Sequence, residues 1–116
     1  MDFGLTEEQT MLRDNVRAFM TKECPSEYVR ECDEKERYPV ELFEKMARLG
    51  WLGIPIPTEF GGSGNSCMDL IVFLEELAYH FEAAANIYYT SIVIAAQAIS
   101  HSGNEAQKRT FLPRLA

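Results

Sequence analysis

The sequence lacks the features that mark several common classes of protein. Its first residues, MDFGLTEEQ, contain neither a basic segment nor an apolar run, so we expect no secretory signal. Its 11 lysines and arginines are outnumbered by 18 aspartates and glutamates, which gives a formal net charge of -7. This acidity argues against general binding to nucleic acid or to anionic membranes, because both would repel the chain.

Cysteine and histidine are also scarce. The three cysteines, Cys24, Cys32 and Cys67, cannot all pair with one another, and their spacing matches neither a zinc site nor a CxxC redox pair. We therefore expect a reducing, intracellular setting and predict a cytoplasmic protein. His80 and His101 have no neighbouring residues at a spacing typical of metal ligands, so we predict no metal site.

Charge is missing altogether from one long stretch. No Asp, Glu, Lys or Arg occurs from Ala83 through Asn104, although these residues make up 25% of the chain. Apolar residues in this stretch cover most of a helical wheel, which predicts a helix enclosed by other helices or by lipid. Polar residues such as Asn86 and Gln97 interrupt a run that barely reaches the roughly 20 residues of a membrane span. We therefore predict no membrane span, but the buried central helix of a soluble bundle, ending near His101.

Local signals predict where the other helices begin and end. Capping-box patterns occur at Thr6, Ser66 and Asn104, Pro39 suits a first helical turn, and Gly50 suits a left-handed C-cap. Apolar periodicity places helices near residues 6–23, 26–37, 39–49, 67–81 and 105–116, and Pro113 should kink or end the last of these. Together these signals predict an all-α fold, an up-and-down bundle of about five to six helices forming one domain, residues 1–116.

Packing predictions follow from the same periodicity. In the third helix we expect a buried side formed by Val40, Phe43 and Ala47 with the neighbouring Leu42, Met46 and Leu49.

Few residues suggest chemistry by themselves. The Gly61–Gly64 run precedes a helix and could suggest a phosphate site, but it lacks the G-x-G-x-x-G spacing and a Walker lysine. A structural turn is the favoured interpretation. Adjacent Glu75 and Glu76 point in different directions on a helix, so they form no carboxylate pair, although Glu75 could pair with a cation on another helix. Tyr88 and Tyr89 stand side by side in the apolar helix, and their hydroxyls either simply reach the edge of the bundle or serve a site.

Four segments of the chain carry a family resemblance: MDFGLTEEQ, ARLGWLGIPIPTEFGGSG, EELAY and GNEAQKRTFLPRLA. In order and spacing they resemble the N-terminal helical domain of acyl-CoA dehydrogenases over essentially the whole chain. The resemblance implies part of an FAD-dependent enzyme that dehydrogenates an acyl-CoA thioester at its α and β carbons. It also implies that the β-domain would begin after Ala116. The catalytic base and most FAD contacts would lie in that domain and in a C-terminal helical domain, which leaves this chain inactive alone.

The resemblance further implies where an acyl chain would lie. In the family, the start of the fifth helix forms the far wall of the acyl pocket, and the matching positions here are Ala85, Asn86, Tyr89 and Val93. The spacing of four places Ala85, Tyr89 and Val93 on one helical face. We expect Tyr89 to shorten the pocket and to favour short or polar acyl groups. No residue of the chain is expected to be catalytic or to hold FAD.

The resemblance implies several partners: the acyl-CoA substrate, the two missing domains, an electron-transfer flavoprotein or similar acceptor, and further copies in a homo-oligomer. Other interpretations stay open. The chain could be a stand-alone helical interaction module, or the same domain of an acyl-CoA oxidase, a nitroalkane-oxidase-like enzyme or a crotonobetainyl-CoA-reductase-type enzyme. A domain that docks onto others should expose an apolar patch above the few hundred Å² usual for monomers.

Overall fold

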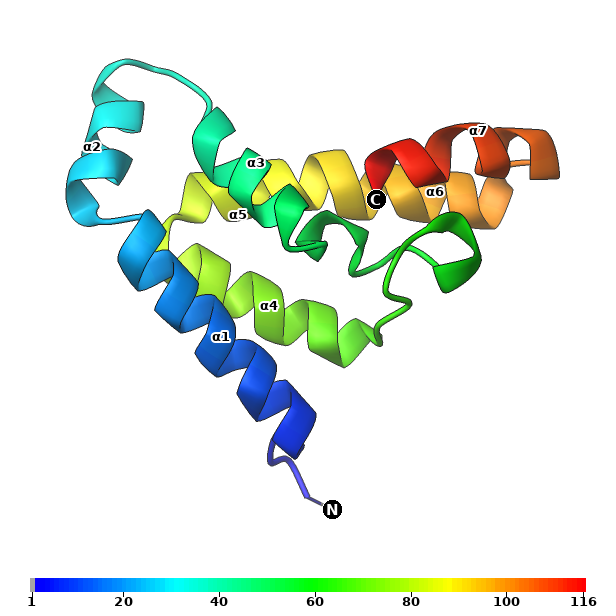
Figure 1. Ribbon diagram of the computed structural model, residues 1–116, viewed down its shortest axis with the longest axis horizontal. Coiled ribbons are helices and arrows are strands. Elements are labelled where there is room, and N and C mark those ends of the chain that lie inside the picture. The colour runs from blue at the N-terminus through cyan, green and yellow to red at the C-terminus, as the bar shows by residue number, and fades with distance from the viewer. Residues whose placement is uncertain (1) are drawn as a thin grey trace.

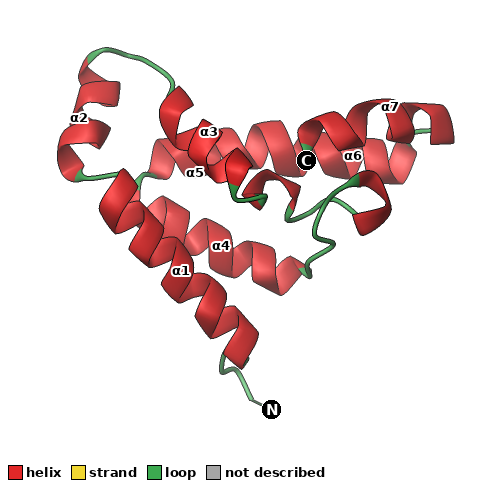
Figure 2. Cartoon of the chain, in the orientation of Figure 1, coloured by secondary structure: helices red, strands yellow, loops and turns green. Residues whose placement is uncertain are grey.

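The computed structural model describes residues 2–116, and all secondary structure in this range is helical. The α-helices are α1 (Glu7–Glu23), α2 (Ser26–Glu34), α3 (Val40–Arg48), α4 (Cys67–His80), α5 (Glu82–Tyr88), α6 (Ala95–Ser102) and α7 (Glu105–Leu115) (Figures 1 and 2). Two short 3-10 helices, η1 (Trp51–Gly53) and η2 (Thr58–Phe60), lie between α3 and α4, and a π-helix, η3 (Tyr89–Ile94), joins α5 to α6. The predicted all-α fold is confirmed.

The helix ends follow the local sequence signals. Thr6, Ser66 and Asn104 each accept a hydrogen bond from the backbone N–H three residues later, and the side chain at that position bonds back to the cap. All three predicted capping boxes are therefore present. Gly50 adopts the left-handed conformation after α3, with φ of 76°. The capping side chains at Thr6, Ser66 and Asn104 satisfy backbone N–H groups that the first helical turn leaves without a partner.

The helices form a flat assembly with extents of 43 × 41 × 22 Å. Since a helix with its side chains is about 10–12 Å across, the shortest dimension holds two layers of helices. α1 packs along α4, α3 lies across α5, and α7 folds back along α6 (Figure 1). A two-layer arrangement leaves one side of most helices uncovered.

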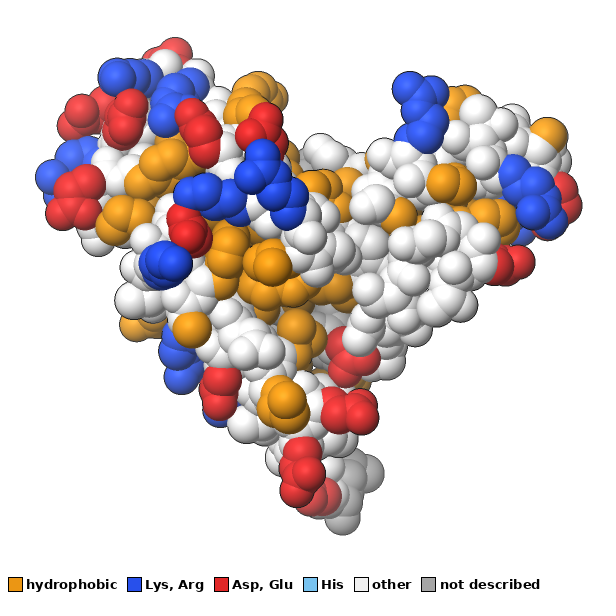
Figure 3. Space-filling view, in the orientation of Figure 1, with side chains coloured by type: hydrophobic (Ala, Val, Ile, Leu, Met, Phe, Trp, Pro, Cys, Tyr) orange, Lys and Arg blue, Asp and Glu red, His pale blue; other side chains and the backbone are white. Residues whose placement is uncertain are grey.

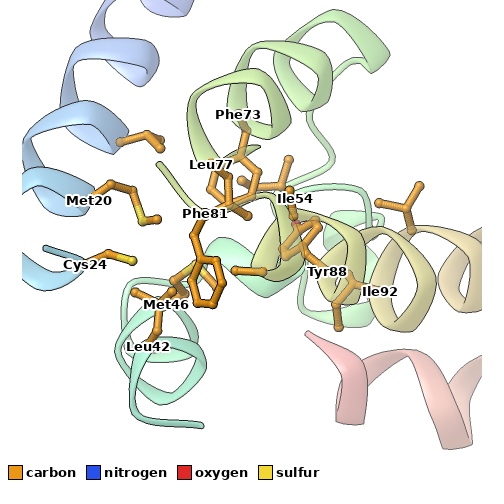
Figure 4. Close-up of a cluster of buried hydrophobic side chains, with 14 of the residues drawn as sticks. Met20, Cys24, Leu42, Met46, Ile54, Phe73, Leu77, Phe81, Tyr88 and Ile92 are labelled. Atoms are coloured by element: carbon orange, nitrogen blue, oxygen red, sulfur yellow. The ribbon is translucent and has the colours of Figure 1, made fainter. Parts of the chain in front are cut away.

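The main core lies where α1, α3, α4 and α5 meet. Its fully buried side chains include Met20 from α1, Met46 from α3, Phe73 and Leu77 from α4, and Tyr88 from α5 (Figure 4). A second, smaller cluster joins the loop after α3 to the C-terminal helices. It consists of Ile56, Phe60, Ala96 and Leu112.

The predicted buried side of α3 is wrong in part, and α7 does not end at Pro113. In α3, Leu42 and Met46 are buried and Phe43 is half-buried, but Ala47 is exposed and Val40 and Leu49 are 55% and 53% exposed. The flat fold covers this helix on one side, so a narrower stripe than expected is enclosed. α7 continues through Pro113 to Leu115. A proline this close to the C-terminal end interrupts few intrahelical hydrogen bonds, which explains why the helix does not stop there.

The prediction of an enclosed central helix also needs correction. The segment from Glu82 to Ser102 is helical throughout, as expected, but its buried residues occupy one side. Ile94 is 50% exposed, and Gln97 and Ala98 are exposed as well. α4 packs on its first part and α7 on its last part, while residues on the other side, among them Tyr89 and Ile94, stay exposed.

Candidate functional site

One continuous helical rod carries all the residues predicted to form a site. It comprises α5, η3 and α6, and the backbone stays helical at both junctions, with φ and ψ of -59° and -48° at Tyr88 and -63° and -48° at Ile94. The rod begins after Phe81, whose extended backbone separates it from α4, and ends at Gly103. We refer to residues 82–102 as the rod.

The π-helical turn keeps the buried side of the rod in line. Tyr88, Ile92 and Ala96 are buried at intervals of four, and Val93 is buried beside them. An α-helix turns by about 100° per residue, which would place Val93 about 140° away from Tyr88 around the axis. The i→i+5 hydrogen bonding of η3 makes a wider turn. The wider turn brings Val93 back to the core side.

The four predicted wall residues differ in their surroundings. Ala85 and Val93 are 7% and 8% exposed and belong to the main core cluster. Tyr89 is 48% exposed, and Asn86 is exposed. Packing in the core therefore already engages Ala85 and Val93, and Tyr89 and Asn86 are the members of the set that remain free to contact a ligand.

The two adjacent tyrosines have separate roles. Tyr88 is fully buried, and its hydroxyl donates a hydrogen bond of 2.7 Å to the carbonyl oxygen of Trp51. Burial raises the pKa of the Tyr88 phenol, so the group stays neutral. Tyr88 is thus a core residue with its polar end satisfied. Tyr89 carries the exposed phenol of the pair.

The exposed side of the rod is unusual because, after Glu82 at its first position, it carries no Asp, Glu, Lys or Arg. Its solvent-facing residues after Glu82 are Ala83, Asn86, Tyr89, Thr90, Ser91, Ile94, Gln97, Ala98, His101 and Ser102. A helix face that remains in water normally carries charged residues. By contrast, the exposed surfaces of α2 and its flanks carry several ion pairs, among them Lys35 with Glu31 and Arg37 with Glu41.

Apolar side chains are exposed elsewhere as well. A shallow groove of about 330 Å³ lies between α3 and the rod, lined mainly by Val40, Phe43, Ala47, Leu52 and Ile87. Figure 3 shows further hydrophobic side chains gathered in the middle of one face, with most charged side chains toward its edges. The exposed side of the rod and the groove beside α3 together present mainly uncharged side chains to solvent.

The glycine-rich loop is a structural turn. The N–H groups of Gly62, Ser63 and Gly64 donate to the carbonyl oxygens of Pro57, Gly53 and Ile56. A Cβ atom at Gly62 would lie 2.0 Å from the Ile56 carbonyl oxygen, so this position requires glycine. N–H groups engaged in this way do not fit a phosphate of FAD. This loop is therefore not a candidate for holding the cofactor.

Histidine and cysteine residues form no site among the described residues. His80 and His101 each contact, through Nδ1, the backbone carbonyl four residues earlier, at 3.0 and 2.9 Å. Cys24, Cys32 and Cys67 are free thiols. Within residues 2–116 no group of three His, Cys, Asp or Glu residues is arranged to hold a metal ion. In the same range, no helix has the length and apolar character needed to cross a membrane.

The sequence did not reveal one partly buried ion pair, between Arg17 and Glu76. Glu76, not Glu75, is the buried carboxylate of α4, and Arg17 of α1 donates to both of its oxygens. Glu76 falls one turn after Phe73 on the side of α4 that meets α1. The signal in the sequence was the spacing of Glu76, three residues after Phe73, which places it on the buried side of α4.

Comparison with known proteins agrees with this fold. Residues 6–116 match the family described as "Acyl-CoA dehydrogenase, N-terminal domain". The chain belongs to the acyl-CoA dehydrogenase family. It is similar to the acryloyl-CoA reductase (NADH) of Anaerotignum propionicum, with 42% identity over 99% of this chain. It is also similar to the short-chain-specific acyl-CoA dehydrogenase of Clostridium acetobutylicum, with 37% identity over all of this chain.

Solved acyl-CoA dehydrogenase structures share the arrangement of helices. The butyryl-CoA dehydrogenase of Megasphaera elsdenii superposes with a TM-score of 0.87 and 31% identity over 99% of this chain. The chain spans 29% and 30% of the two relatives above and 30% of this structure. The described helices thus correspond to the N-terminal domain of a family whose members are much longer.

Proposed function

We propose that this domain works within an FAD-dependent oxidoreductase that changes the bond between the α and β carbons of a short acyl-CoA. The observation that carries the proposal is the uncharged, solvent-facing side of the rod. Covering such a face with further polypeptide and an acyl chain removes apolar area from water without burying a charge. The catalytic base and the groups that hold FAD would be supplied by residues outside 2–116.

Tyr89 is the proposed end wall of the acyl pocket. Its side chain is 48% exposed, and none of the hydrogen bonds of residues 2–116 involves its hydroxyl. A large side chain at that place shortens the space left for an acyl chain. The names of the three relatives, which refer to acryloyl-CoA, short-chain and butyryl-CoA enzymes, support a short acyl group for this chain as well.

The direction of the reaction is a second point of the proposal. Dehydrogenation with an electron-transfer flavoprotein or similar acceptor is the first candidate. Reduction of the α,β double bond is the second candidate, because the relative with 42% identity is named as a reductase.

We further propose a cytoplasmic homo-oligomer. A stand-alone interaction module is disfavoured, because residues 6–116 match the N-terminal domain of a family whose members are much longer enzymes.

A chain-length profile tests the proposal. In the complete enzyme, Tyr89→Ala should raise kcat/KM for longer acyl-CoA substrates relative to the preferred one. Each methylene that becomes buried contributes about 0.8 kcal/mol, so two additional methylenes should gain roughly 15-fold. Tyr79→Ala, on the exposed side of α4, is the matched control and should leave the profile unchanged. An unaltered profile in Tyr89→Ala would contradict the proposed pocket.

A further inference from the structure

We propose that α2 is a hinged flap, which swings as one unit away from the corner between α4 and α5 while the rest of the core stays folded. The corner comprises residues 79–83, where the chain turns from α4 into the rod. Four features of the structure carry this inference: the weak attachment of α2, its unfavourable charges, the non-helical segments on both sides of it, and the open space beneath it.

α2 is attached to the domain by few side chains. Its buried residue is Cys32, and Tyr28 and Val29 are only partly buried against the main core cluster. Among residues 2–116, α2 packs closely along no other helix, whereas α1 packs along α4, and Figure 1 shows α2 at the edge of the domain. Elements with few buried apolar contacts open locally at a lower free energy than the core.

The charges of α2 do not favour its own helix. Asp33 and Glu34 lie in its last turn, which contains no basic residue. Negative charge at this end of a helix is unfavourable, because the unpaired carbonyl groups there already carry partial negative charge. At the other end, Pro25 occupies the N-cap position and provides no side-chain hydrogen bond. A helix of nine residues with these ends depends on its neighbours for stability.

Non-helical residues bound α2 on both sides and form the two hinges. Cys24 leaves the helical conformation after α1, with φ of -131° and ψ of 60°, and Pro25 is extended, with ψ of 162°. After α2, Glu36 has a φ of 49°, in the left-handed region, which costs free energy for a residue that carries a Cβ atom. Hinges are typically a few residues at the ends of elements that can change φ and ψ.

Open space lies between α2 and the corner. A cavity of about 620 Å³ is lined by α2 residues such as Val29 and Arg30 and by residues 79–83 of the corner. A second cavity, of about 330 Å³, is lined by Cys32, by the loop that follows α2 and by the start of the rod. Asp33, Phe81 and Ala83 line both cavities. An outward movement of α2 therefore joins the two cavities over Phe81 and exposes the start of the rod.

A cluster of three side chains, the clasp, holds α2 against α3. The Tyr28 hydroxyl donates to the Glu41 carboxylate at 2.9 Å, and the Arg37 guanidinium donates to the same carboxylate at 3.0 Å. Arg37 also lies over the Tyr28 ring, 5.6 Å from its centroid. The side chains of Arg37 and Glu41 are 30% and 57% exposed, and pairs so accessible to water contribute little to stability. The clasp thus favours the closed position without locking it.

Hydrogen exchange of the complete protein tests the flap, read by peptide mass spectrometry at several low concentrations of urea. We expect the amides of α2 to exchange more than about tenfold faster than those of α1 and α4. Their exchange should depend little on urea, because opening the flap exposes little surface. Equal protection of α2 and α4, with the same urea dependence, would overturn the inference. Fast exchange confined to the ends of α2 would also overturn it, since it indicates fraying of the helix.

Two variants should shift this exchange in opposite directions. Glu41→Gln weakens the clasp and should speed exchange throughout α2 by about two- to fivefold. Glu34→Lys places a positive charge in the last turn of α2 and should slow it by about two- to fivefold. Glu44→Gln, on the same helix as Glu41 but outside the clasp, is the control and should leave exchange in α2 unchanged. If both variants behave like this control, α2 is not a flap held by the clasp.

Discussion

Tyr88 donates its phenolic hydrogen to the carbonyl oxygen of Trp51 at 2.7 Å, and this bond ties the rod to the loop that follows α3. The Tyr88 ring also packs on Phe73, with ring centroids 4.9 Å apart, and Phe73 contacts Trp51 edge-on at 5.7 Å. Phe19 of α1 extends the row against Trp51. Aromatic contacts of this kind join α1, η1, α4 and α5 in a single core, and Figure 4 shows the Phe73 and Tyr88 rings within it.

Removing the Tyr88 hydroxyl should destabilise the domain without disturbing its packing. Tyr88→Phe deletes one hydrogen bond in the core, and we expect the free energy of unfolding to fall by about 1 kcal/mol. Urea unfolding monitored by circular dichroism measures the change. Tyr89→Phe is the matched control and should stay within about 0.5 kcal/mol. Equal losses in both variants would show that the bond to Trp51 contributes nothing specific.

Arg17 should matter more for stability than a surface arginine. Arg17→Met leaves the buried Glu76 carboxylate without its partner, and an unpaired buried charge is strongly unfavourable. Arg13→Met, which breaks the exposed pair with Asp14, should change the free energy of unfolding by about 0.5 kcal/mol or less. Adding Glu76→Gln to Arg17→Met should recover part of the loss. No recovery in this double variant would contradict the pairing.

The three cysteines should differ sharply in reactivity. Cys24 and Cys32 are buried, and burial raises the pKa of the Cys24 thiol to about 11, so little thiolate forms there. Cys67 is exposed at the start of α4. Iodoacetamide at mildly alkaline pH should therefore modify Cys67 alone, and all three cysteines after denaturation. Peptide mass spectrometry reads the sites, and early labelling of Cys24 would disprove the packing of α1 against its neighbours.

Stability should fall in acid partly through Glu41. Its own backbone N–H, the Arg37 guanidinium and the Tyr28 hydroxyl all donate to its carboxylate, and they lower the Glu41 pKa from 4.5 to about 2. Because the folded pKa lies below the unfolded one, the stabilisation is complete above pH 4.5 and is lost as the pH falls toward 2.

Replacement of Glu41 tests this pH dependence. Glu41→Gln should flatten the decline in unfolding midpoint below pH 4.5, as measured by denaturant titrations on either side of that value. Glu44→Gln on the same helix is the control, since Glu44 forms no ion pair with any described residue. A decline of equal slope in Glu41→Gln and the unmodified protein would show that the carboxylate is not held by these donors.

Helix boundaries could be predicted from sequence because their causes are local. A capping box such as Thr6 with Gln9 involves residues three positions apart, and Gly50 ends α3 through its own backbone conformation. The short, charged helix α2 was likewise predictable, with Cys32 as its buried residue. The expectation that Pro113 could end α7 was wrong, because the effect of a proline on a helix depends on how many turns follow it.

Burial could not be predicted in the same way, because it depends on how many layers the helices form. The absence of charge from Ala83 to Asn104 indicated that this segment is covered by other groups, but it did not reveal which neighbouring residues cover it. Packing places Ala85 and Val93 in the core and leaves Tyr89 exposed. The sequence placed the four proposed wall residues on one helix, and the structure shows which of their side chains are exposed.

The sequence by itself determined the helices and their caps, since each is encoded within a few neighbouring residues, and it also determined the family and the absence of charge from Ala83 to Asn104, which are properties of the order of residues alone. The tertiary structure alone decided the register of the rod. Tyr88 is anchored against Trp51 and Ala96 in the second cluster, and the π-helical turn between them brings Val93 onto the same side. These contacts join segments far apart in the chain, and in this arrangement Ile94 is exposed while Val93 is buried in the core.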